Sequence, residues 1–141
     1  MYNVITIGDA LIDTHVLIDN ASVECDLNKA HCKLCFDYAS KIPITDSFQS
    51  IGGSAANVAV GIKKLGLNSI LLTSIGDDSN GKIILEELKK YQIPTNLVRV
   101  DSTKTRYAIV LNFKAERTIL SYHEKRDYKF PKTLPETDWI Y

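Results

Sequence analysis

Short apolar runs alternate with two amphipathic stretches along the first hundred residues. Residues 2–7 and 69–75 are apolar and rich in β-branched side chains, which indicates two buried strands. Residues 54–65 are apolar nearly all round, which predicts a helix packed on most sides. Residues 82–91 have one apolar face and predict a second helix. With a third strand expected over 97–100, this alternation is typical of a parallel sheet covered by helices.

Two segments interrupt this alternation. Residues 20–49 are largely polar and lack a helical period, and they contain two strand-like pieces, 32–38 and 41–48. Residues 107–113 and 117–122 predict a hairpin closed by a three-residue link. We expect the two segments to pair into one small sheet that forms a flap. Arg117, Lys125 and Arg126 could face a phosphate under the closed flap, but we interpret them as charges on an exposed strand edge that discourage pairing with other sheets.

Composition and charge narrow the function classes. The 141 residues suffice for one domain, and 17 Lys and Arg balance 17 Asp and Glu, with no basic stripe that would bind nucleic acid. No apolar run approaches the about 18 residues of a membrane span. The amino-terminal residues lack the basic and apolar regions of a signal peptide, so a cytoplasmic location is predicted.

Three cysteines lie close together at positions 25, 32 and 35. An odd number without an export signal favours reduced thiols over a disulfide framework. Together with His31, the three thiols could form a tetrahedral zinc site. Strand alternation, however, would place Cys32 and Cys35 on opposite faces, so reduced cysteines without a metal remain the expectation.

Candidate chemistry gathers around a Gly52-Gly53 turn ahead of the first helix. Such a turn lets a ligand approach the backbone and the helix's first N–H groups, although glycines can also serve only to make the bend. Asn57 is a lone amide in an apolar helix, where it could bind a hydroxyl-rich ligand or a neighbouring backbone. Asp13 follows the first strand, where its carboxylate could accept from two adjacent hydroxyls or cap a turn.

Four stretches of this sequence resemble the amino-terminal half of the PfkB (ribokinase-like) family of carbohydrate and nucleoside kinases. They are "GDALID", "GGSAANVAVGIKKLG", "ILLTSIGDDSNGKIILEELKKYQI" and "ERTIL". The resemblance implies an α/β fold, with a three-layer α/β/α sheet and a small β-sheet lid, truncated before the nucleotide-binding half. The implied core spans about 1–14, 50–104 and 123–141, and the implied lid spans about 15–49 and 105–122.

The resemblance also implies roles for individual residues. Asp13, Gly53, Ser54 and Asn57 would contact substrate hydroxyls, and Gly52 would shape the turn beneath them. Leu11 departs from the asparagine usual there in ribokinases, which leaves a sugar and a nucleoside both open as the substrate. The lid implies a homodimer contact.

The family's nucleotide-side motifs do not occur in these 141 residues. Phosphoryl transfer needs an anion hole and a base, which the family takes from a Gly-Ala-Gly-Asp turn, and Mg²⁺, which an Asn-x-x-Glu motif arranges. We therefore expect no catalytic residue in this chain, with ATP and Mg²⁺ used by the full-length enzyme and not bound by this chain alone. The alternative is a non-catalytic sugar-binding or dimerisation module. The absence of a G-x-G-x-x-G after the first strand argues against a dinucleotide-binding oxidoreductase.

Overall fold

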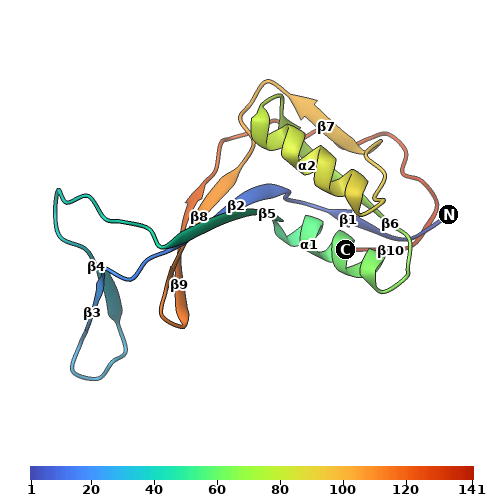
Figure 1. Cartoon of the computed structure of the whole chain (residues 1–141). Helices are drawn as coiled ribbons and strands as arrows, with labels where there is room; N and C mark the ends of the chain where they lie inside the picture. Colours follow the sequence, from blue (N-terminus) through green and yellow to red (C-terminus); the bar gives the residue numbers. More distant parts are fainter.

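A four-stranded parallel sheet forms the core of the protein. The computed structural model describes all 141 residues, with two helices and ten strands (Figure 1). The core strands lie in the order β10-β1-β6-β7. They are β1 (Tyr2–Ile7), β6 (Ser69–Gly76), β7 (Val98–Asp101) and β10 (Thr137–Ile140). All neighbours in this sheet are parallel, which confirms the predicted alternation of strands and helices.

Both helices pack into one apolar cluster with the core sheet. Helix α1 (Ser54–Lys64) contributes three buried alanines, and α2 (Ser79–Lys90) contributes Ile84 and Leu88. The expectation that α1 is packed on most sides is wrong, because only those alanines are fully buried. Helix α2 begins three residues earlier than expected, because the Asp78 carboxylate accepts the Gly81 N–H at 2.8 Å and caps the helix.

A second four-stranded sheet, which we call the lid, adjoins the core. Its order is β5-β2-β8-β9, with β2 parallel to β8 and the other pairs antiparallel. The strands are β2 (Leu11–Leu17), β5 (Asp46–Gly52), β8 (Tyr107–Phe113) and β9 (Glu116–Tyr122). The expectation that the two interrupting segments form one sheet is confirmed in part: β5 and β8 flank β2 in the lid, whereas the piece expected over 32–38 belongs to a separate sheet. The hairpin link is two residues and not three, because Glu116 already pairs with Phe113.

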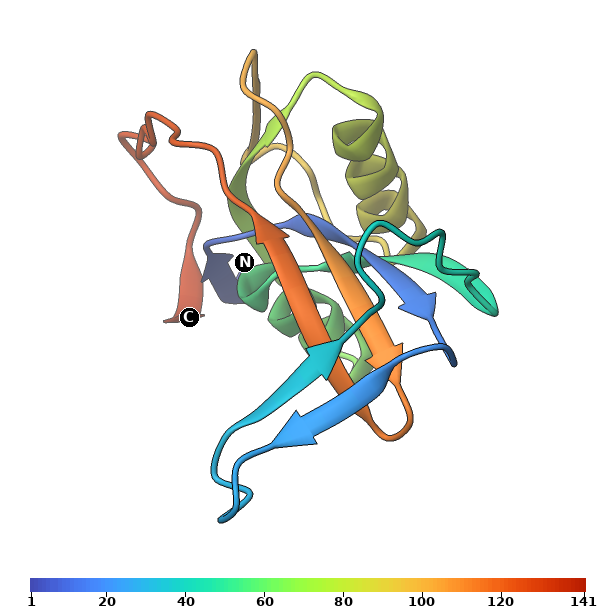
Figure 2. The same ribbon diagram turned by 90° about the vertical axis from the view of Figure 1, so that its left-hand side faces the viewer.

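A third, two-stranded sheet extends from the lid. Strands β3 (Ser22–Cys25) and β4 (Cys32–Cys35) form a hairpin that projects from the lid's far end, away from both termini (Figures 1 and 2). The prediction of three reduced thiols is wrong, because Cys25 and Cys32 form a disulfide. The hairpin places these two residues directly opposite each other, which the sequence spacing did not reveal. Cys35 is a free thiol.

Two features are absent from the structure. No group of three or more His, Cys, Asp or Glu side chains is placed to hold a metal ion. Neither helix has the length and apolar character that crossing a membrane requires.

Arg126 lies buried where the chain returns from the lid to the core. Its side chain forms an ion pair with Asp101 at 3.1 Å and donates to the carbonyl of Lys104 at 2.7 Å. The interpretation of Arg126 as an exposed edge charge is therefore wrong, since only 8% of the residue is exposed. Arg117, by contrast, lies exposed on the edge strand β9, as expected.

We expect the free energy of unfolding to decrease as the pH falls below about 4. Burial alone raises the pKa of Asp78 and of Asp101, but hydrogen bonds and the charge of Arg126 outweigh it, and both pKa values lie below the ordinary value. A carboxyl with a lowered folded-state pKa stabilises the protein above its unfolded-state pKa, and this stabilisation is lost as the pH falls through the folded-state pKa.

Urea unfolding at a series of pH values measures this dependence. The Asp101→Asn variant should lose less stability on acidification than the wild type, because one of the two carboxyls no longer titrates. If the free energy of unfolding fell with pH equally in the two proteins, the lowered pKa of Asp101 would be contradicted.

Candidate functional site

Helix α1 starts at a turn that only glycine can occupy. Gly53, the residue before the helix, has a φ of 96°, and a Cβ atom built on it would lie 2.3 Å from the carbonyl oxygen of Asp9. The same carbonyl accepts a hydrogen bond from the N–H of Ala56 at 3.2 Å. The turn between β1 and β2 therefore passes directly over the first turn of α1, and position 53 requires glycine both for its conformation and for this close contact.

The first N–H groups of α1 are open. No side chain caps the helix, and the N–H groups of Ser54 and Ala55 have no acceptor within the chain. Ser54 itself is exposed. Because unpaired N–H groups at a helix start favour an acceptor, this end of α1 can donate hydrogen bonds to a ligand oxygen.

Asp13 lies beside the same turn. A Cβ atom on Gly52 would lie 2.2 Å from Oδ2 of Asp13, so the carboxylate occupies the space that a side chain at position 52 would need. Asp13 is half-buried, and its carboxylate accepts no hydrogen bond within the chain. In the register of β2 and β5, Asp13 is opposite Ser50, which places both side chains on one face of the lid. A half-buried carboxylate without a protein partner can accept from ligand hydroxyls.

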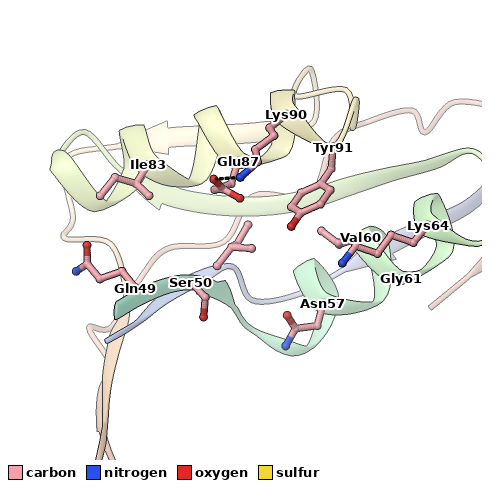
Figure 3. Close-up of a pocket in the computed structure, with 11 residues that line it drawn as sticks. Gln49, Ser50, Asn57, Val60, Gly61, Lys64, Ile83, Glu87, Lys90 and Tyr91 are labelled. Carbon is pink, nitrogen blue, oxygen red and sulfur yellow. Dashed lines mark hydrogen bonds and ion pairs between the residues drawn. The ribbon is translucent and has the colours of Figure 1, made fainter. Parts of the chain in front are cut away.

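Asn57 lies one turn into α1, where its N–H donates to the carbonyl of Gly53 at 2.9 Å. The alternative in which the Asn57 amide binds a neighbouring backbone is wrong, because Asn57 is exposed and its side chain forms no hydrogen bond within the chain. Figure 3 shows the Asn57 amide and the Ser50 hydroxyl pointing away from α2. The structure thus brings the Asp13 carboxylate to the Gly52-Gly53 turn, with Asn57 on the next turn of the same helix.

A cavity of about 530 Å³ lies between α1 and α2, next to this turn (Figure 3). Its walls are formed by Gln49, Ser50, Ile51, Asn57, Val60, Gly61, Lys64, Ile83, Glu87, Lys90 and Tyr91. The cavity includes Asn57 but none of Asp13, Gly52, Gly53 or Ser54, so it adjoins the predicted site without containing it. Lys90 pairs with Glu87 at 3.2 Å, and Nζ of Lys64 lies 5.3 Å from the ring centre of Tyr91.

Sequence reasoning missed an aromatic pair on the Asp13 face of the lid. His15 and Phe48 are opposite each other in β2 and β5, and their rings stack with centroids 4.5 Å apart and planes 6° from parallel. His15 follows Asp13 by two residues and therefore shares its face. That alternation was a signal for His15, but nothing in the sequence placed Phe48 beside it. An ion pair between Arg106 and Asp9, at the root of the lid, was also missed.

Comparison with known proteins gives three findings. The sequence profile of the pfkB family of carbohydrate kinases matches residues 14–141. The chain is 30% identical over 123 residues to an ATP-dependent 6-phosphofructokinase of Thermoanaerobacterium thermosaccharolyticum. The aligned region covers 87% of this chain and 32% of that protein. The chain is 32% identical over 82 residues to a fructokinase of Klebsiella pneumoniae, and this aligned region covers 58% of this chain and 24% of that protein. The chain thus spans a third or less of the length of these two relatives.

A solved structure shows the same arrangement of strands and helices. Ribokinase of Arabidopsis thaliana, in complex with ribose and ATP, superposes with a TM-score of 0.66 at 21% identity. The superposition covers 86% of this chain and 36% of that protein. At this level of identity the likeness shows that the two proteins share a fold.

Proposed function

Because this chain belongs to the pfkB family of carbohydrate kinases, we propose that it carries the substrate-binding part of an ATP-dependent sugar or nucleoside kinase. The observation that carries the proposal is the half-buried Asp13 carboxylate, which has no partner within the chain and lies against the bare backbone of Gly52. Its oxygens are free to accept hydrogen bonds, and a polyhydroxylated ligand supplies the donors.

Each part of the site has a distinct role in this proposal. Asp13 accepts hydrogen bonds from two adjacent hydroxyls and thereby fixes the orientation of the substrate. The open N–H groups at the start of α1 donate to a ligand oxygen, and Gly53 allows the ligand to approach them. The exposed amide of Asn57 can donate and accept at once. Together they offer the mixed donors and acceptors that a sugar requires.

We assign ATP and Mg²⁺ to the complete enzyme of this family. When bound, ATP supplies the phosphoryl group that the substrate hydroxyl receives. No Gly-Ala-Gly-Asp turn or Asn-x-x-Glu motif occurs in the 141 residues, so their contribution is to bind and orient the hydroxylated substrate. The homodimer contact expected through the lid stays a prediction, which sedimentation velocity on this chain tests.

The Asp13→Asn variant is expected to lose most of its sugar affinity, by about tenfold to hundredfold, because a charged acceptor is replaced by an amide of similar size. The measurement is the thermal midpoint against ribose, fructose and adenosine, each with and without MgATP. A ligand that binds the native state raises the midpoint. The wild type should respond to one of these ligands, and Asp13→Asn should respond far less at the same concentration.

The matched control is Asp37→Asn, which removes an exposed carboxylate that binds nothing else in the chain. It should respond to the ligand as the wild type does. A wild type that responds to none of the three ligands, or an Asp13→Asn variant that responds equally, would overturn the proposal.

A further inference from the structure

Asp78 joins three segments where the lid meets the core. Oδ1 accepts from the Gly81 N–H at 2.8 Å and from the Thr105 hydroxyl at 2.7 Å, and Oδ2 accepts from the Thr105 N–H at 2.8 Å. The Thr105 hydroxyl in turn accepts from the Gly76 N–H at 2.8 Å. These four hydrogen bonds connect the end of β6, the start of α2 and the residue that precedes β8 by two positions. We call this group of residues the Asp78 junction.

The Asp78 junction is tightly packed. Thr105 is 1% exposed. A Cβ atom on Gly81 would lie 2.1 Å from the carbonyl oxygen of Gly76 and 3.1 Å from the Thr105 hydroxyl oxygen. Because backbone atoms of the three segments are in direct contact, the chain at Thr105 cannot move without breaking these hydrogen bonds.

A short path leads from the junction to Asp13. Thr105 is followed by Arg106, whose carbonyl accepts the Ile12 N–H at 3.3 Å. Two residues further on, Ala108 is the partner of Asp13 in the parallel pairing of β2 with β8. Strand β2, which carries Asp13, is therefore paired with β8, and the residues that lead into β8 are held in place at Thr105.

The chain that leaves the lid is fastened at the same place. Arg126 donates to the carbonyl of Lys104, the residue before Thr105, and forms an ion pair with Asp101. The chain also passes from the lid back to the core through Gly53, whose turn packs against the carbonyl of Asp9. The Asp78 junction and the Gly53 turn are thus two separate attachments of the lid, and the Asp78 junction is the one held by side-chain hydrogen bonds.

We propose that Asp78 is a positioning residue for Asp13: through Thr105 it fixes the root of β8 and so sets the orientation of the lid against the core. The inference rests on the proposed function, since Asp13 is the group that is positioned. It assigns Asp78 a role beyond capping α2, because Oδ1 accepts from both the helix and the Thr105 hydroxyl, and Oδ2 accepts only from the Thr105 N–H.

Asp78→Asn separates the two roles. An asparagine side chain has one acceptor oxygen, which can still cap α2, and its amide nitrogen cannot accept the Thr105 N–H. The lid orientation can be followed by energy transfer from Trp139, the only tryptophan, to a dye on Cys35, the only free thiol. Hydrogen exchange of the Ile12 amide reports the pairing of β2 with the root of β8.

In Asp78→Asn we expect a broader distribution of Trp139-to-dye distances, faster exchange at Ile12 and about a tenfold loss of sugar affinity. Thr105→Val, which removes the hydroxyl, should show the same changes, and Thr105→Ser, which keeps the hydroxyl, should behave as the wild type does. The matched control is Asp77→Asn, because the adjacent Asp77 is exposed and its side chain forms no hydrogen bond. It should leave all three readouts unchanged.

The outcomes distinguish this inference from the proposed function. If Asp78→Asn lowers only the free energy of unfolding, with distances and Ile12 exchange as in the wild type, Asp78 is a helix cap and the positioning role is wrong. If the wild type binds no sugar but the variant still changes both lid readouts, the proposed function fails and the junction remains the anchor of the lid.

Discussion

Replacing Gly53 by alanine should lower the free energy of unfolding by about 3 kcal/mol and abolish any ligand-induced rise of the thermal midpoint. Two effects add at this position. A residue with a side chain is strained at a φ of 96°, and its Cβ atom would lie 2.3 Å from the Asp9 carbonyl oxygen. Relief of this contact must shift either the β1–β2 turn or the start of α1, and both belong to the candidate site.

Two other glycines separate the effects when urea unfolding is measured for all three variants. Gly66 has a φ of 84° but no atom within 4 Å of its Cβ position, so Gly66→Ala should cost about 1 kcal/mol. Gly61 lies within α1, also with nothing within 4 Å, and Gly61→Ala should stabilise by about 0.5–1 kcal/mol. A Gly53→Ala cost no larger than that of Gly66→Ala would show that the turn yields freely, contrary to our interpretation.

Replacing Arg126 by methionine should cost about 3 kcal/mol of the free energy of unfolding. The change keeps the apolar stem but leaves the Asp101 carboxylate without its buried counter-charge. It also leaves the carbonyl of Lys104 without its donor. Breaking a buried ion pair on one side is costly because the remaining charge stays in a poorly solvated place.

Arg117→Met is the matched control, because Arg117 is exposed and forms no ion pair. It should change the free energy of unfolding by no more than about 0.5 kcal/mol. The double variant with Asp101→Asn should cost less than the sum of the two single variants, because the two groups interact directly. Equal costs for Arg126→Met and Arg117→Met would refute the buried role of Arg126.

The core of the fold could be predicted because its signals are local. The two central strands of the parallel sheet, β1 and β6, are largely apolar runs, and each helix has its own apolar pattern and end signals, so their positions follow from short windows of sequence. The PfkB resemblance was confirmed by the family match and by the shared fold. Helix α2 began early because a single residue, Asp78, decides where a helix starts.

Features that depend on long-range pairing could not be predicted in this way. Arginine is usually found on the surface, and Arg126 is buried only because the chain returns to pack against Asp101. The disulfide depends on a hairpin register that places Cys25 opposite Cys32. In the candidate site, the glycine turn and Asp13 were recognised from the sequence, whereas the exposure of Asn57 and the stacking of Phe48 on His15 required the structure.

The parallel pairing of β2 with β8 has a kinetic consequence. The strand that carries Asp13 lies near the start of the chain, and its partner follows only after both helices and the two core strands β6 and β7. Contacts between residues so distant in sequence form late, because the entropy of closing a long loop must be overcome first. During synthesis, β2 and β5 can pair as soon as both have emerged, but the open edge of β2 must wait for β8. We therefore expect refolding to show an early phase for β1, β6 and the helices, and a slower one for the pairing of β2 with β8 and of β1 with β10.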